Sequence, residues 1–399
     1  MKVANRVNNI NPSFTLQMVT KAEEMRSKGI DIINFSVGEP DFNTPKHIRD
    51  AAKDALDQGY TKYTAGPGMI EFREAICHKL EKENGISYEP SDILVSNGEK
   101  QSLYTACQAL FNSGDSVVIF SPYWVSFPEF VKMADSNPVL VNTTPENNFE
   151  PDFSDLESKI NPQIKGVIIN SPSNPTGGVW SENAIAKLLK IAKQYDWTVI
   201  SDECYERLIY GGEFVSAERL NQLHDIGATV VTCMSLSKTY AMTGWRIGYA
   251  GGPKEIIDVM RKLQSQSTTN PSSISQAAAV EALNGTQNFI EERNKSFKER
   301  RDFIVNSLNE IDGISCLKPS GAFYVFPNCS KFFNKKDKQG KKIINDTEFV
   351  TSLLENYHVA VVQGSAFGLE GYFRVSYATS MDNLKKALER ISNFCKSLS

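Results

Sequence analysis

Short runs of hydrophobic residues recur along the chain, and segments with helical spacing of apolar residues separate them. The runs lack polar alternation, which is typical of strands buried on both faces of a parallel sheet. The candidate strands are 93–95, 117–120, 167–169, 198–200, 230–232 and 246–250. The candidate helices are 99–111, 181–195 and 253–266, the last with Pro253 in its first turn. The pattern predicts an α/β fold with a mostly parallel sheet flanked by helices.

The C-terminal part of the chain has a different order of elements. Predicted helices over 286–310 and 379–398 flank a strand-like run at 322–326 and a second one near 359–362. This order predicts a smaller α+β domain that the N-terminal segment completes. We therefore expect three parts: an N-terminal arm joining the small domain, a large domain and the small C-terminal domain, at 1–46, 47–290 and 291–399.

Composition narrows the possible functions. The 399 residues carry a formal net charge of −4, and the pI is near 5.8, which argues against nucleic acid or an anionic membrane as a partner. The N-terminus lacks an apolar signal core, and no run of 18 apolar residues occurs. The seven cysteines include no C-x-x-C pair, which indicates reduced thiols in a cytoplasmic protein.

Metal chemistry is not indicated. The four histidines lie too far apart in sequence to suggest a metal cluster, and no Walker A loop is present. An enzyme of this composition is therefore expected to use an organic cofactor. The six lysines between residues 331 and 342 are interpreted as part of a solvated loop, 331–346.

Polar motifs follow five of the predicted strands directly. In a parallel α/β sheet, ligands bind outside the carboxyl ends of the strands. The five loops are therefore expected to converge on one crevice. They begin, in chain order, at Ser96, Ser121, Asn170, Asp202 and Ser235.

The segment 235–246 carries the most specific chemistry. Lys238 follows a buried strand closely, which holds its amine in place and favours the neutral nucleophile that forms a Schiff base. Ser235, Ser237 and Arg246 surround it with groups that bind a phosphate. A Schiff-base lysine beside a phosphate pocket is what pyridoxal phosphate requires. Taken alone, Lys238 would be interpreted as a surface lysine after a strand; the other parts of the same site favour the Schiff-base role.

Three motifs in this order resemble those of the class I, fold type I pyridoxal-phosphate-dependent aminotransferases, most closely the prokaryotic-type aspartate aminotransferases. They are N-P-T-G at 174–177, S-D-E-x-Y at 201–205 and S-x-S-K-x(7)-R at 235–246. The resemblance extends from Asn11 to Thr379, which is nearly the whole chain.

The resemblance implies a role for each matched residue around the cofactor ring. Lys238 would form the Schiff base and then carry the proton between the substrate Cα and the cofactor. Asp202 would pair with the pyridine nitrogen and keep it protonated. Asn174 and Tyr205 would hydrogen-bond the phenolic oxygen, and Trp124 would stack on the ring. Without the resemblance, these residues would be read as a helix cap, a turn and core aromatics.

The phosphate would lie on the backbone amides of Gly98 and Glu99, where a helix begins. Ser235, Ser237 and Arg246 would complete this cradle. Many relatives have a second glycine where Glu99 stands, so its carboxyl alters the charge balance here. In the family, a tyrosine of the neighbouring subunit reaches the phosphate. Tyr63 matches it and implies a homodimer with shared sites, although from residues alone it would be an aromatic packed in a loop.

Substrate contacts also follow from the resemblance. Arg374 would bind the α-carboxylate in bidentate fashion, helped by the backbone of Gly38 and by Trp124 and Asn174. Lys100 would contact the distal carboxylate of an acidic substrate, and Ser13 and Thr15 would assist it. Closure of the small domain would then exclude water.

The resulting hypothesis is a homodimeric aminotransferase that exchanges the amino group between L-aspartate and 2-oxoglutarate in a ping-pong cycle. An aromatic amino acid or prephenate aminotransferase is the main alternative on the same scaffold. A pyridoxal-phosphate-dependent lyase would keep the same cofactor residues, and ammonia or cleavage products would reveal it. A ligand sensor fused to a DNA-binding module and a purely structural protein are the non-enzymatic alternatives; the latter would not need Lys238.

Overall fold

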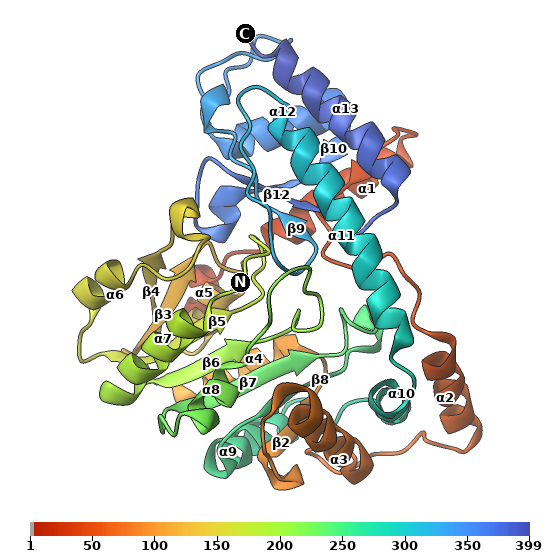
Figure 1. The fold of residues 1–399 in the computed structure, drawn as a ribbon, viewed down its shortest axis with the longest axis vertical. Coiled ribbons are helices and arrows are strands. Elements are labelled where there is room, and N and C mark those ends of the chain that lie inside the picture. Colours follow the sequence, from red (N-terminus) through yellow and green to blue (C-terminus); the bar gives the residue numbers. More distant parts are fainter. Residues whose placement is uncertain (1–3) are drawn as a thin grey trace.

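A seven-stranded sheet forms the core of the larger part of the molecule. The computed structural model describes residues 4–399, and Figure 1 shows the sheet in its lower half. The strand order is β2-β8-β7-β6-β5-β3-β4. All neighbours pair in parallel except β8, which is antiparallel to both β2 and β7. The strands are β2 Ile93–Ser96, β3 Ser116–Ser121, β4 Asn137–Asn142, β5 Ile164–Asn170, β6 Thr198–Asp202, β7 Thr229–Ser235 and β8 Gly248–Gly251.

Both faces of this sheet are covered by helices. One face packs on α6 Phe153–Lys159, α7 Glu182–Gln194 and α8 Ala217–Leu223. The other face packs on α4 Glu99–Leu110, α5 Phe127–Met133 and α9 Lys254–Ser265. Adjacent residues of one strand, such as Val230 and Val231, enter opposite clusters, so the strands are apolar throughout without alternation. The predicted α/β fold with a mostly parallel sheet is confirmed.

Three further helices, α2 Lys46–Asp57, α3 Ile70–Lys79 and α10 Ser273–Asn284, pack together beside β2 and β8.

In this sheet, one predicted strand needs correction and one strand at the edge was missed. The predicted strand 246–250 begins only at Gly248, because Arg246 has a positive φ of 53° and belongs to the preceding turn. The edge strand β4 was not predicted, since three of its six residues are exposed and only Val141 is buried.

The smaller part combines the two ends of the chain. Its antiparallel sheet has the order β11-β12-β9, and β1 pairs in parallel with β10. The strands are β1 Ile33–Asn34, β9 Tyr324–Val325, β10 Val359–Ala360, β11 Val362–Gln363 and β12 Phe373–Ser376. They pack with α1 Phe14–Ser27, α12 Asp346–Tyr357 and α13 Met381–Ser397 in one hydrophobic core. In Figure 1, the red α1 lies beside these blue C-terminal elements.

The 22-residue helix α11, Asn288–Asn309, extends from the large part into the small one (Figure 1). Near its start, Asn294 Nδ2 donates to the Arg207 carbonyl of the large part at 2.7 Å. Farther along, Phe297, Ile304 and Leu308 are buried in the core of the small part. The domain boundaries after residues 46 and 290 remain a prediction.

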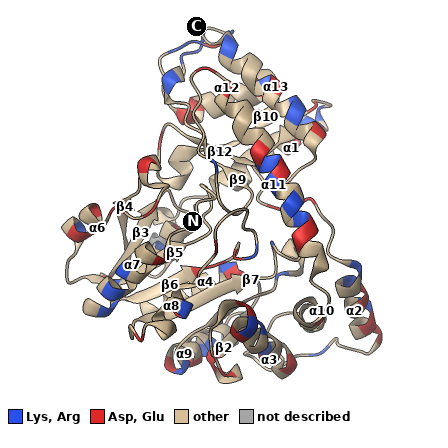
Figure 2. Cartoon of the chain, viewed as in Figure 1, with Lys and Arg blue, Asp and Glu red and all other residues tan. Residues whose placement is uncertain are grey.

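Charged side chains are spread over both parts, and the two signs alternate along α11 and α13 (Figure 2). Within residues 4–399, no helix is long and apolar enough to cross a membrane. The same residues contain no group of three or more His, Cys, Asp or Glu side chains that could hold a metal ion.

Candidate active site

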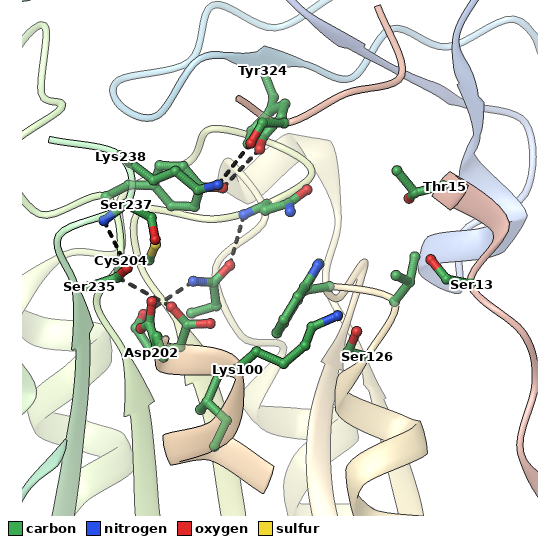
Figure 3. Close-up of a pocket in the computed structure, with 18 of the residues that line it drawn as sticks. Ser13, Thr15, Lys100, Ser126, Asp202, Cys204, Ser235, Ser237, Lys238 and Tyr324 are labelled. Carbon is green, nitrogen blue, oxygen red and sulfur yellow. Dashed lines mark hydrogen bonds between the residues drawn. The ribbon is translucent and has the colours of Figure 1, made fainter. Parts of the chain in front are cut away.

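The five loops that follow β2, β3, β5, β6 and β7 line one cavity of about 280 Å³. The small part closes its other side with β9 and β12, and the N-terminal segment contributes Ser13, Thr15 and Leu16. Figure 3 shows Lys238 and Asp202 on one side of the cavity and Ser13 and Thr15 on the other. Of the predicted residues, those lining the cavity are Ser13, Thr15, Gly38, Glu99, Lys100, Trp124, Asn174, Asp202, Tyr205, Ser235, Ser237, Lys238, Arg246 and Arg374.

Lys238 lies three residues beyond β7 and is half-buried. Its Nζ donates to the Gly38 carbonyl at 2.8 Å, and in Figure 3 its side chain extends toward the side of the cavity where Tyr324 lies. Gly38 must be a glycine, because a Cβ there would lie 2.2 Å from Tyr324 Oη. The interpretation of Lys238 as a surface lysine is wrong, since the amine is inside the cavity.

Asp202 ends β6 and is buried, 5% exposed. One of its oxygens accepts from the Cys204 amide at 3.2 Å. Burial raises the pKa of Asp202 to about 6, while hydrogen bonds from neighbouring groups and the charge of Lys238 oppose the rise. A buried carboxylate with few partners is well suited to pair with a cation on a bound ligand.

Arg374, on β12, links the small part to the strand-end loops. It is 2% exposed and donates from Nη1 to Asn174 Oδ1 at 2.8 Å and from Nη2 to the Ser36 carbonyl at 2.6 Å. Its Nε is buried with no hydrogen-bond partner among the described residues, and burial lowers the pKa of Arg374. A buried guanidinium without a carboxylate partner fits a site that receives an anionic ligand. The alternative of a surface ion pair is wrong.

An anion cradle forms where α4 begins. Gly98 has a φ of 81°, and a Cβ there would lie 2.4 Å from the Arg246 guanidinium. This close approach brings Arg246 next to the free amides of the first helical turn, which favour an anion. Ser235 ends β7 and Ser237 lies in the turn after it, where the Ser237 amide donates to Ser235 Oγ at 3.0 Å. Amides, hydroxyls and one guanidinium are the donor set that a phosphate requires.

Lys100 lies beside Trp124 on the cavity wall. Its Nζ lies 4.9 Å from the centre of the Trp124 ring, and in Figure 3 the side chain extends toward Ser126. Burial in the cavity wall lowers the pKa of Lys100, and the positive charges of Arg246 and Lys238 lower it further. Ser13 caps α1, where its Oγ accepts from the Leu16 amide at 3.4 Å, and Thr15 follows in the first turn.

Two predicted residues are not among those lining the cavity. Gly98 lies just behind it, against Arg246. Tyr63 is 88% exposed, so it neither reaches the cavity of its own chain nor packs in its loop as an ordinary aromatic would.

Several lining residues were missed by the sequence analysis. Tyr324 Oη lies 2.8 Å from Tyr205 Oη, and Asn170 donates from Nδ2 to the Asp202 carbonyl at 3.1 Å and accepts from the Asn174 amide at 2.8 Å. Asn170 could have been found, because it directly follows the apolar run 167–169 and ends β5. The others carry no motif of their own; they are Leu16, Leu103, Val125, Ser126, Cys204 and Tyr324.

The residues fit pyridoxal phosphate: an amine, a buried carboxylate, an aromatic ring and an anion cradle line one cavity. The family model described as aminotransferase class I and II matches residues 30–391. An aspartate aminotransferase of Rhizobium meliloti (strain 1021) is 45% identical over 99% of this chain and 97% of its own. An aspartate/prephenate aminotransferase of Cereibacter sphaeroides is 45% identical over 98% of each chain.

Solved structures agree with these matches. The crystal structure of the Rhizobium meliloti aspartate aminotransferase superposes with a TM-score of 0.96 at 45% identity and covers 100% of both chains. That of the Thermus thermophilus aspartate aminotransferase with maleate gives a TM-score of 0.92 at 40% identity, over 99% of this chain and 100% of the other.

Proposed function

Because this chain belongs to the class I and II aminotransferase family and uses pyridoxal phosphate as its cofactor, we propose that its substrates are L-aspartate and 2-oxoglutarate. The products are oxaloacetate and L-glutamate. The observation that carries the substrate proposal is the arrangement of two basic groups, Arg374 and Lys100, on the wall of one small cavity. A dicarboxylic amino acid offers one carboxylate to each.

The residues around the bound cofactor ring have distinct roles. When bound, the cofactor supplies a ring that stabilises negative charge at the substrate Cα. Lys238 Nζ would take the proton from Cα and return one during the exchange, and Asp202 would face the ring nitrogen as a carboxylate. Asn174 and Tyr205 would hydrogen-bond the phenolic oxygen, and Trp124 would stack on the ring.

Other residues would anchor the cofactor phosphate and bind the substrate carboxylates. The cofactor phosphate would lie on the amides of Gly98 and Glu99 and on Ser235, Ser237 and Arg246. Arg374 would bind the α-carboxylate with its free Nε and one Nη, beside the backbone of Gly38 and the side chains of Asn174 and Trp124. Lys100 would bind the distal carboxylate, with Ser13 and Thr15 beside it.

The relatives support aspartate as a substrate and prephenate as a second one. The Thermus thermophilus enzyme was solved with maleate, a dicarboxylate. The Cereibacter sphaeroides relative is named for aspartate and prephenate together, so prephenate is the second candidate. Leu16, Leu103 and Val125 line the same cavity and offer the apolar surface that a ring-bearing substrate needs.

Lys100→Ala tests the role of the distal cation. We expect kcat/KM for aspartate to fall about ten- to hundredfold, because a charge-assisted hydrogen bond is lost, and kcat/KM for phenylalanine to change less than about threefold. Steady-state kinetics with both donors measure the split. An equal loss for the two donors would show that Lys100 does not read the side chain.

We further propose that the enzyme is a homodimer in which Tyr63 serves the partner's cradle. Four large apolar residues, Leu56, Tyr60, Tyr63 and Ile70, are exposed within the single segment 56–70, as expected of an interface. Tyr63→Phe should weaken cofactor binding about tenfold, since one hydrogen bond to the phosphate is lost, and leave the mass unchanged in sedimentation velocity. A fully active monomer would contradict the proposal.

The proposed compartment is the cytoplasm. All seven cysteines are free, as in a reducing environment. Fractionation of the native cells tests this, and recovery of the enzyme outside the cytoplasmic fraction would contradict it.

A further inference from the structure

A second carboxyl group lies in the cavity next to Asp202. Glu99 is the first residue of α4 and is buried, 7% exposed. Its side chain turns inward from the helix and lies within hydrogen-bonding reach of Asp202 and Cys204. Its Oε1 is buried without any donor among the described residues. Two ionised carboxylates can only accept, so this contact is unfavourable unless one of them holds a proton.

Three observations place the proton on Glu99. Asp202 already accepts from the Cys204 amide, whereas Glu99 Oε1 lacks a donor. Burial and the neighbouring Asp202 raise the pKa of Glu99 well above its usual value. A proton on Glu99 also turns it into a donor, so both carboxyls are satisfied at once.

No described cation donates a hydrogen bond to Glu99 Oε1 that would hold this group ionised. The amides at the start of α4 favour an anion, but this is a smaller effect than desolvation beside a second carboxylate. The titratable groups that face Glu99 are the thiols of Cys204 and Cys233, the phenol of Tyr249 and the amine of Lys238. Two cations lie near Glu99: Lys238, whose charge lowers the pKa of Glu99, and Arg246, whose guanidinium approaches Gly98. Neither donates to Glu99 Oε1, and the Lys238 Nζ donates to the Gly38 carbonyl instead.

We propose that Glu99 is a positioning residue that remains a neutral carboxylic acid and donates a hydrogen bond to Asp202, holding that carboxylate ionised and oriented toward the cofactor's ring nitrogen. The inference rests on the proposed role of Asp202 and adds a function for the Glu99 side chain. Stabilising the carboxylate makes Asp202 a weaker base, so the ring nitrogen keeps its proton. The extra carboxyl therefore adds no net charge to the site.

The first test is infrared spectroscopy of the cofactor-loaded enzyme at neutral pH. The C=O stretch of a protonated carboxylic acid is separate from carboxylate bands. We expect such a band in the wild type and its loss in Glu99→Gln. Glu203→Gln is the matched control: Glu203 is buried nearby, accepts from Ser201 and Ser216, and has a pKa raised to about 8 by burial, so it should remove a different band. A difference spectrum for Glu99→Gln with carboxylate bands alone would overturn the proposal.

The second test is cofactor affinity. Glu99→Gln keeps an N–H donor and should bind pyridoxal phosphate within about threefold of the wild type, whereas Glu99→Ala should bind it about ten- to hundredfold more weakly. Equal affinities for the two variants would show that a hydrogen-bond donor at this position does not support cofactor binding. If Glu99→Ala does not fold, the infrared comparison with Glu99→Gln still decides. Neither test involves an amino acid substrate, so an error in the proposed substrates would leave both results unchanged.

Discussion

Lys238→Ala is expected to lower the transamination rate by more than about 10⁴-fold, because the variant loses both the nucleophile and the proton carrier at Cα. The Nζ atom is the one amine that donates to the Gly38 carbonyl inside the cavity, and the neighbouring Lys100 lies over Trp124 instead. Apart from Lys238 and Lys100, no described lysine lines this cavity, so no further amine could replace the one that is lost. Rapid mixing of the cofactor-loaded variant with aspartate, followed by cofactor absorbance, measures the loss.

Folding must be separated from chemistry in this experiment. Lys238 makes a single hydrogen bond, so its removal should cost only about 1 kcal/mol of stability. Lys254→Ala is a suitable control, since Lys254 begins α9 and its side chain pairs with Asp258 at the surface. The control should retain wild-type activity. A Lys238→Ala enzyme within tenfold of the wild type would rule out the assigned role.

Arg374→Ala is expected to lower kcat/KM about 10²- to 10³-fold for every amino acid donor, because the α-carboxylate loses a buried guanidinium partner. Arg374→Lys should recover little, since an ammonium cannot reproduce the bidentate geometry. The common loss for aspartate, glutamate and phenylalanine distinguishes Arg374 from Lys100, whose removal should affect acidic donors selectively. Steady-state kinetics with the three donors provide the comparison.

A buried arginine elsewhere in the small part controls for stability. Arg301 is 4% exposed, donates to the Pro319 carbonyl and pairs with Asp302, and it does not line the cavity. Arg301→Ala should lower the melting temperature and leave KM for aspartate unchanged. If Arg301→Ala and Arg374→Ala raise KM alike, the effect of Arg374 is structural and the α-carboxylate assignment fails.

Most of the sheet could be predicted because its strands are buried on both faces. Val118 and Val230, for example, lie in uninterrupted apolar runs and are fully buried. An apolar run does not indicate in which direction its strand pairs, so the antiparallel pairing of β8 could not be inferred. The edge strand β4 escaped because solvent reaches one side of it and its pattern mixes exposed and buried residues.

The site was predictable where its residues lie at the carboxyl ends of strands, as Asp202 and Ser235 do. Contacts between distant parts of the chain were not. Tyr324 meets Tyr205 across 119 residues, and Arg374 reaches Asn174 across 200; no local spacing encodes either contact. The orientation of Glu99 was equally hidden, because its position in the first turn of α4 suggests a solvated side chain near the phosphate.

The half-reaction of the cofactor-loaded enzyme with single amino acids tests the central claim most directly. Aspartate, glutamate, phenylalanine and alanine would each be mixed in excess with the enzyme, and loss of the absorbance band of the Lys238-bound cofactor would be followed. The account predicts rapid conversion with aspartate and glutamate and slow conversion with phenylalanine and alanine. Conversion with phenylalanine as fast as with aspartate would contradict it.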